Sequence, residues 1–134
     1  MVLVDSNVIM DAIAGDSEET RWSVNTLERL SNDSTLVINP LIYAEVSVAL
    51  ASIEALETAL PLNLYRRDGL PYEAGFLAGK AFLEYRRRGG LRTSPLPDFY
   101  IGAHAAVARY KLLTRDAARY KTYFPTVDLI APNV

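Results

Sequence analysis

Short apolar runs that stop at a polar residue recur along this chain, and helical patterns separate them. Residues 2–4 stop at Asp5, and residues 36–38 stop at Asn39. Runs of this kind are typical of strands buried on both faces of a parallel sheet. Two further strands are predicted over residues 112–114 and 127–131. Strands that alternate with helices predict an α/β fold, a three-layer α/β/α sandwich with a small, mainly parallel sheet.

Helical spacing of apolar residues accounts for most of the remaining sequence. Helices are predicted over residues 16–30, 41–53, 53–60, 72–88, 98–109 and 117–123. A polar turn is expected at residues 5–7, and a loop at residues 91–97, which hold two prolines. The sequence of 134 residues is 50% hydrophobic and contains no repeat or linker, which predicts one domain over residues 1–134.

The composition restricts the possible chemistry. The chain has no Cys and one His, which excludes a disulfide framework, a zinc–thiolate site, an iron–sulfur cluster and a thiol nucleophile. The one histidine, His104, lies among alanines and is interpreted as structural. The first ten residues carry Asp5 where a secretion signal would be apolar, and no apolar stretch reaches the ~20 residues of a membrane span. A cytoplasmic protein without membrane contact is therefore expected.

Two aspartates follow predicted strands. Asp5 comes directly after the first strand, and Asp116 follows the strand at residues 112–114 with one residue between. The carboxyl ends of parallel strands meet at one edge of a sheet, which is where ligands bind in open sheets. For each aspartate taken alone, the role of a turn residue or a helix cap is favoured.

Glu45 lies within the apolar arc of its predicted helix. That arc holds Leu41, Ile42, Val46 and Leu50, and Ser52 is its only other polar member. A carboxylate on an apolar face is costly unless it is paired, protonated or bound to a metal. A functional role is therefore favoured over a side chain that bends toward solvent or toward an arginine.

Asp98 follows Pro97 at the start of a predicted helix, where an aspartate commonly acts as N-cap. The same helical face carries Ile101, Gly102 and Ala105, whose side chains are small or apolar and allow a neighbour to pack closely. Asp98 is therefore expected to point along the packed side of the helix.

Four acids from separate elements are better explained together than apart. Carboxylates without His or Cys suit Mg²⁺ or Mn²⁺, and a metal held in this way can hydrolyse a phosphate ester. The predicted catalytic and metal-binding residues are Asp5, Glu45, Asp98 and Asp116. Asn7 and Thr114 could orient these ligands, although turn chemistry explains them equally well.

Four stretches carry a resemblance to a known family. They are DSNV at residues 5–8, NPLIYAEV at 39–46, PDFYIGAHA at 97–105 and LLTRDAARY at 112–120. In this order they resemble PIN-domain proteins, and within that superfamily the VapC toxins of toxin–antitoxin pairs. The resemblance runs from end to end of the chain. The turn after the first strand often reads Asp-Thr-Asn in such proteins, and here Ser6 keeps the hydroxyl.

The resemblance implies a PIN-like fold and an endoribonuclease that needs Mg²⁺ or Mn²⁺. It assigns the acidic quartet to Asp5, Glu45, Asp98 and Asp116, all of which are present. It further implies an RNA substrate, a VapB-type antitoxin that blocks the active site, and a homodimer.

The formal net charge of −2 is the sum of an acidic first part and a basic second part of the chain. Residues 1–60 have a balance of −8, and residues 61–134 have a balance of +6. The basic residues expected to contact RNA are Arg86, Arg87, Arg88 and Arg92. Beside a nuclease site they could hold the phosphate backbone, although such a cluster is usually a solvated helix face.

Two other functions remain open. A phosphatase of the haloacid-dehalogenase type would use Asp5 as a nucleophile, but it usually carries a second acid where this chain has Asn7. A non-catalytic PIN module that binds RNA or a protein is the other alternative.

Overall fold

The computed structural model describes residues 1–93 and 96–133. These residues form a sheet of five parallel strands in the order β3-β2-β1-β4-β5. The strands are β1 (Val2–Val4), β2 (Leu36–Ile38), β3 (Tyr65–Arg67), β4 (Lys111–Leu113) and β5 (Leu129–Ile130). The chain builds the sheet outward from β1 in one direction and then returns to add β4 on the other side. The order of strands therefore reverses between β1 and β4.

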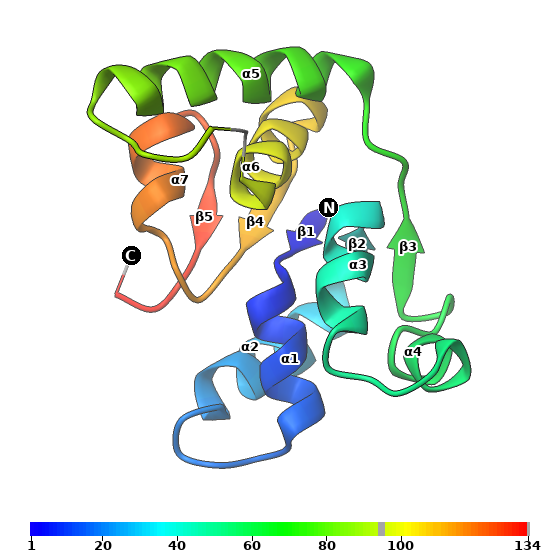
Figure 1. Ribbon diagram of the computed structural model, residues 1–134. Coiled ribbons are helices and arrows are strands. Elements are labelled where there is room, and N and C mark those ends of the chain that lie inside the picture. The colour runs from blue at the N-terminus through cyan, green and yellow to red at the C-terminus, as the bar shows by residue number, and fades with distance from the viewer. Residues whose placement is uncertain (94–95, 134) are drawn as a thin grey trace.

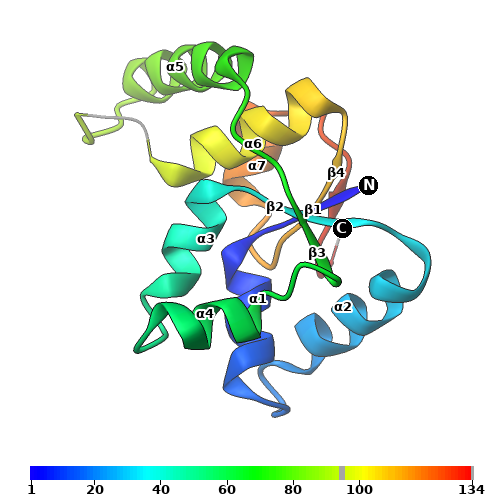
Figure 2. The ribbon, with the colours of Figure 1, turned by 90° about the vertical axis from the view of Figure 1, so that its right-hand side faces the viewer.

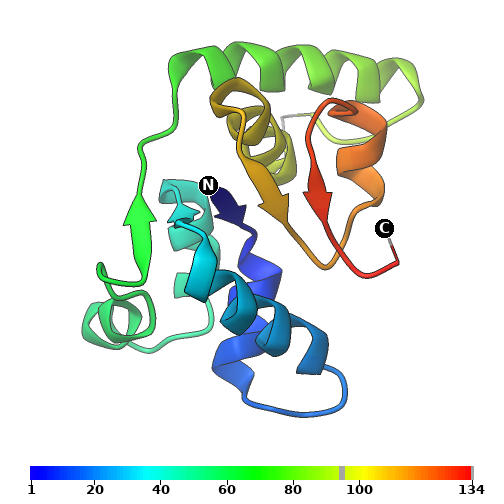
Figure 3. The same ribbon diagram turned by 180° about the vertical axis from the view of Figure 1, so that it is seen from behind.

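Helices cover both faces of this sheet and confirm the three-layer α/β/α architecture. In the described part of the chain they are α1 (Ser6–Ala14), α2 (Arg21–Asp33), α3 (Pro40–Ser47), α4 (Ile53–Ala59), α5 (Tyr72–Arg87), α6 (Pro97–Ala108) and α7 (Ala118–Tyr123). Figure 2 shows α2 on one side of the sheet and α3 and α6 on the other, and Figure 3 shows α2 from its own side. Helix α5 lies across the outer side of α6 (Figure 1). Among the described residues, no helix is long and apolar enough to cross a bilayer.

The apolar runs form the centre of the core, as predicted. All three residues of β1 are buried, and Leu3 pairs with Val37 on one side and Leu112 on the other. On the face covered by α6, a Cβ at Gly102 would collide with the ring of Phe124, so the glycine allows the close packing expected for this helix. Helix α6 is thus packed closely on the face of the sheet that holds β1 and β4.

Strand β3 was not predicted, because its sequence lacks an apolar run. Of its three residues only Tyr65 is buried, while Arg66 and Arg67 are exposed. The strand lies at the edge of the sheet, where exposed charged side chains are common because they discourage pairing with another chain. The prediction of four strands was therefore one short.

Helix boundaries differ from the prediction where polar side chains cap the backbone. The turn predicted at residues 5–7 is instead the start of α1, because Asp5 Oδ1 accepts a hydrogen bond from the Ser6 amide at 2.8 Å. The prediction over residues 41–53 was too long, since α3 ends at Ser47 and Ser52 caps the separate helix α4. The helix predicted from residue 16 begins at Arg21.

The loop predicted at residues 91–97 includes residues 94 and 95, which lie outside the described residues. Its last residue, Pro97, is already the first residue of α6.

Candidate active site

The predicted acids lie around the carboxyl ends of β1 and β4, where the strand order reverses. Asp5 follows β1 directly, and its amide donates a hydrogen bond to the carbonyl of Leu113 at 2.9 Å. This places the Asp5 carboxyl at the switch point of the sheet, the position at which open parallel sheets bind ligands.

Asp5 is the most buried of the four acids, with 4% of its surface exposed. Its Oδ2 accepts hydrogen bonds from the Thr114 hydroxyl at 2.9 Å and from the Tyr120 hydroxyl at 2.9 Å. Burial raises the pKa of Asp5, and nearby Asp98 raises it further, while the two hydroxyl donors oppose the shift. The carboxyl is therefore fixed in orientation at an energetic cost to its ionised form.

Glu45 is half-buried on α3 and faces Asp5 across the first turn of α1. The Ser6 hydroxyl donates to Glu45 Oε1 at 2.9 Å. Burial raises the pKa of Glu45, and the charges of Asp5 and Asp98 add to the increase. The apolar arc predicted around Glu45 extended too far, because Leu50 lies beyond the end of α3 at Ser47, but the inward position predicted for Glu45 is found.

Asp98 lies in the first turn of α6 but is not its N-cap, which is Leu96. Its Oδ2 lies 3.4 Å from Nη1 of Arg119 on α7. Burial raises the pKa of Asp98, Arg119 lowers it and Asp116 raises it. The side chain therefore points along the packed side of α6 toward α7.

Asp116 is exposed and lies in the loop between β4 and α7. Its amide donates to the Thr114 hydroxyl at 3.1 Å, which ties this loop to the end of β4. Asp98 and Asp116 line one open cleft of about 400 Å³, and Tyr85 and Tyr123 form part of its wall. A polymer can therefore approach the acids from this side.

Asn7 and Thr114 join the two strand ends. The Thr114 hydroxyl donates to Asp5 and accepts a hydrogen bond from Asn7 Nδ2 at 3.3 Å. The Oδ1 atom of Asn7 accepts from the amide of Arg115 at 3.1 Å. Both side chains thus contact the acid-bearing segments, as their expected orienting role requires.

The four acids are electrostatic neighbours, but they are not yet a formed cation site. The negative charge of Asp98 raises the pKa of both Asp5 and Glu45. Within residues 1–93 and 96–133, however, no three acid or histidine side chains are arranged to hold a metal ion. Three of the carboxylates instead contact protein donors. Asp5 accepts from the Thr114 and Tyr120 hydroxyls, Glu45 accepts from the Ser6 hydroxyl, and Asp98 lies beside Arg119. An oxygen-only set of mutually repelling carboxylates fits a hard divalent cation.

A family model described as PIN domain matches residues 2–125. The chain belongs to the PIN domain family. This match confirms the PIN-like fold and the resemblance to PIN-domain proteins that the sequence indicated.

Solved structures similar in fold to this PIN domain include a chain of VapBC2, a chain of FitAcB and a chain described as part of a toxin–antitoxin complex. A chain in the crystal structure of VapBC2 from Rickettsia felis, bound to a promoter DNA fragment, has 20% identity and a TM-score of 0.73, with 98% of each chain covered. A chain of a toxin–antitoxin complex from Klebsiella pneumoniae has 23% identity and a TM-score of 0.71, again with 98% of each chain covered. A chain of FitAcB from Neisseria gonorrhoeae has 21% identity and a TM-score of 0.70, with 97% of this chain and 96% of the other covered. No curated protein sequence matches the chain.

Some residues that contact the acids were missed in the sequence analysis. Tyr120 and Arg119 lie in a stretch that was recognised, but nothing in the spacing indicated that α7 turns a phenol toward Asp5 and a guanidinium toward Asp98. Ser6 was noted only as a substitute for threonine, yet its hydroxyl holds Glu45.

An ion pair between exposed Arg115 and buried Asp11 supports the loop that carries Asp116. Arg115 Nη1 lies 2.8 Å and 2.9 Å from the two carboxyl oxygens of Asp11 on α1. Asp11 also accepts a hydrogen bond from the Ser23 hydroxyl at 2.5 Å and is only 7% exposed. The pair anchors Arg115, the residue that separates Thr114 from Asp116 in the chain. Helices α1 and α2 therefore both help to position the loop that carries Asp116.

The predicted RNA-contacting arginines lie at the end of α5 and in the segment that follows it. Arg86 donates to the carbonyl of Arg92 at 2.6 Å, and Arg88 lies 3.1 Å from Glu84. Arg87 lies 3.6 Å from the same glutamate. The four arginines are exposed, and only Arg88 reaches an aromatic ring beside the acids, that of Tyr123.

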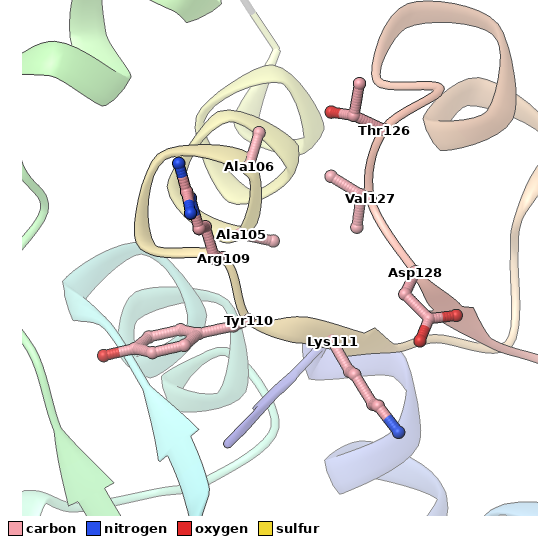
Figure 4. A pocket seen from close by; sticks show the side chains of 8 residues that line it. All are labelled: Ala105, Ala106, Arg109, Tyr110, Lys111, Thr126, Val127 and Asp128. Atoms are coloured by element: carbon pink, nitrogen blue, oxygen red, sulfur yellow. The ribbon is translucent and has the colours of Figure 1, made fainter.

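A further pocket of about 460 Å³ lies at the opposite edge of the sheet (Figure 4). It is formed where α6 leads into β4 and where the chain enters β5, and Arg109, Lys111 and Asp128 are its charged side chains. It holds none of the predicted site residues, so the candidate active site is the smaller acidic cleft.

Proposed function

We propose that this PIN domain is a metal-dependent endoribonuclease of the VapC type that hydrolyses RNA phosphodiester bonds. The observation that carries the proposal is the meeting of four carboxylates, from β1, α3, α6 and the loop after β4, at the switch point of the sheet. The charge of Asp98 raises the pKa of both Asp5 and Glu45, and the charge of Asp116 raises the pKa of Asp98, so neighbouring carboxylates destabilise the ionised forms of these three acids.

In this proposal Asp5, Glu45, Asp98 and Asp116 hold Mg²⁺ or Mn²⁺. A cation bound there supplies an activated water and stabilises negative charge on the phosphate. The Thr114 and Tyr120 hydroxyls hold Oδ2 of Asp5, and Ser6 holds Glu45, so the carboxylates are oriented before substrate arrives. Asn7 keeps Thr114 in place.

The test is cleavage of single-stranded RNA by the purified protein with Mg²⁺, with Mn²⁺ and with EDTA. Cleavage is expected with either metal and not with EDTA. The metal should also raise the free energy of unfolding, by about 2.7 kcal/mol at a hundredfold excess over its dissociation constant. A protein that never cleaves RNA, and whose melting temperature is the same across a Mn²⁺ titration, would overturn the proposal.

The proposed partners are an antitoxin of the VapB type and a second copy of the chain. The resemblance to VapC toxins supports both, and the structures similar in fold include VapBC2 and one described as a toxin–antitoxin complex. Light scattering on the protein alone tests the homodimer. Co-purification with the product of a neighbouring short gene, together with loss of cleavage in the complex, tests the antitoxin.

Arg86, Arg87, Arg88 and Arg92 are proposed to hold the RNA backbone beside the acids. Replacing Arg86, Arg87 and Arg88 with alanine should weaken RNA binding and reduce its salt dependence, since each phosphate contact releases a counterion. Equal affinity and equal salt dependence in the variant would remove the arginines from the proposal.

The phosphatase alternative is not supported. The position that would carry its second acid is Asn7, whose amide already contacts Thr114 and the Arg115 backbone. A non-catalytic module remains the competing outcome of the cleavage test, and it would bind RNA equally with and without metal.

A further inference from the structure

The cleft beside Asp98 and Asp116 has a second wall made of aromatic and basic side chains. Tyr85 of α5, Tyr123 of α7 and Arg119 line it together with the two acids. Its volume of about 400 Å³ falls in the ~300–1,000 Å³ range of pockets that hold small-molecule-sized groups. The cleft can therefore hold more than a cation and its waters.

The aromatic wall is held in place from behind. Phe99 is fully buried, and its ring meets Tyr85 edge-to-face at 5.5 Å and Tyr123 at 5.4 Å between centroids. Tyr85 and Tyr123 are themselves partly exposed and lie 6.4 Å apart at 64°. Packing of this kind fixes the ring planes, so a group that stacks on them finds a surface that is already ordered.

Two arginines accompany these rings. The guanidinium of Arg88 lies 5.7 Å from the centre of the Tyr123 ring, and that of Arg119 lies 5.8 Å from the centre of the Tyr85 ring. Arg119 is also 3.4 Å from Asp98. Arg119 therefore brings positive charge into the same cleft as the aromatic rings and the carboxylates, and Arg88 lies against Tyr123, one of the residues that line it.

We propose that this cleft is the subsite for one unpaired nucleotide of a single-stranded RNA. The base stacks on Tyr123, while Arg88 and Arg119 contact the phosphates on either side, so that the chain passes the acids. Only unpaired bases can be splayed out onto an aromatic ring or a guanidinium plane, and such stacking tolerates any base. This subsite rests on the nuclease function proposed above.

The first experiment compares variants of Tyr123 in steady-state cleavage of a fluorescent single-stranded RNA. Tyr123→Leu removes the ring but keeps an apolar side chain, and it should raise KM roughly tenfold, the lower part of what base stacking contributes, with little effect on kcat. Tyr123→Phe restores the ring and should recover most of the lost affinity. Tyr72→Leu on α5 is the matched control, because Tyr72 is 96% exposed and lies outside the cleft.

The second experiment removes the base from the substrate. Oligonucleotides with one abasic position are scanned across the cleavage site. One abasic position should raise KM for the wild type about as much as Tyr123→Leu does, and the two changes together should cost little more than either alone. Additive losses would mean that the ring and the base do not interact, which would overturn the subsite.

A variant that fills the cleft distinguishes loss of the subsite from loss of folding. Thr122 is exposed on α7 and lines the cleft, so Thr122→Trp should obstruct it and raise KM without lowering the melting temperature. Wild-type KM in both Thr122→Trp and Tyr123→Leu would refute the subsite.

The outcomes separate the two proposals. Absence of cleavage by the wild type overturns the nuclease function itself, whereas cleavage that is insensitive to Tyr123 and Thr122 overturns only the subsite. If the variants bind RNA normally but lose binding of an antitoxin polypeptide, the cleft is a protein-binding site, and the subsite is again overturned.

Discussion

The Tyr120 hydroxyl donates a hydrogen bond to Oδ2 of Asp5 at 2.9 Å, across 115 residues of sequence. The same oxygen accepts the Thr114 hydroxyl, and Oδ1 accepts the Ser6 amide. The carboxyl that follows the central strand is therefore held by α1, by the end of β4 and by α7. Any change in α7 that moves the phenol is transmitted to Asp5.

Replacing Tyr120 by phenylalanine tests this contact. The ring stays in the core while Asp5 loses one donor, so the free energy of unfolding in urea should fall by about 1–3 kcal/mol. The Mn²⁺ concentration for half-maximal stabilisation should rise by about 10- to 100-fold, as it does when groups behind metal ligands are removed. Tyr65→Phe, a buried tyrosine of the edge strand β3, is the control and should keep the Mn²⁺ response. An equal response in both variants would show that the phenol does not orient Asp5.

Asp98→Asn should abolish cleavage while the fold survives. Cleavage should fall by at least ~100-fold, because the variant removes a proposed metal ligand. Without metal the variant should melt no lower than the wild type, since one of the repelling carboxylates is gone. Asp128→Asn, an exposed acid at the opposite edge of the sheet, is the matched control for loss of one negative charge. Full activity of Asp98→Asn with Mg²⁺ or Mn²⁺ would remove Asp98 from the site.

Asp11→Asn should lower both stability and turnover. The substitution weakens the contacts of Asp11 with Arg115 and Ser23, and about 1–3 kcal/mol of the free energy of unfolding should be lost. Because Arg115 precedes Asp116, kcat should fall more than KM rises. Asp16→Asn, which breaks the exposed 3.6 Å pair with Arg21, should change stability by less than ~1 kcal/mol. Equal effects of the two substitutions would contradict the supporting role of the Asp11–Arg115 pair.

His104 should remain neutral in the folded protein well below pH 6.5. Burial lowers its pKa, although Asp68 at 4.0 Å from Nε2 opposes the shift. Asn39 Oδ1 accepts the Ile42 amide, so its Nδ2 faces and donates to Nδ1 of His104, which must stay unprotonated. The chain has one histidine, so a single imidazole NMR signal reports this pKa directly.

The linked stability follows from the direction of that shift. The unfolded chain binds the proton near pH 6.5, before the folded protein does. The contribution of His104 to stability is therefore complete above that pH and is lost as the pH falls toward the folded pKa, with a slope of up to ~1.4 kcal/mol per pH unit. His104→Gln should reduce this slope. An NMR midpoint at or above 6.5 would refute the prediction.

The parts of the fold that could be predicted are those specified by local apolar patterns. Residues 2–4 and 36–38 are continuous apolar runs and residues 112–113 are two leucines, and these segments form the three central strands. Strand β3 has two exposed arginines and is formed by pairing with β2. No local sequence pattern indicates such a pairing. Helix ends were mispredicted where one side chain, such as Ser52 or Asp5, decides the backbone geometry.

The positions of the four acids were predictable, and those of the side chains that contact them were not. Asp5 and Asp116 follow strands, so topology alone places them at one edge. The direction of a side chain on a neighbouring helix depends on packing angles, and this is why Tyr120 and Arg119 were missed. The aromatic wall was missed for the same reason, since Tyr85 and Tyr123 meet only through the packing of α5 and α7 on Phe99.

The central position of β1 has a consequence for biosynthesis. This strand is made before β4, but its pairing with β4 awaits Lys111, and the hydroxyls that hold Asp5 come from residues 114 and 120. A chain that is still incomplete at this point has an unpaired strand edge and an Asp5 without its two hydroxyl donors. Asp5 therefore reaches its final geometry only after both β4 and α7 have formed, although it comes from the first strand of the sheet.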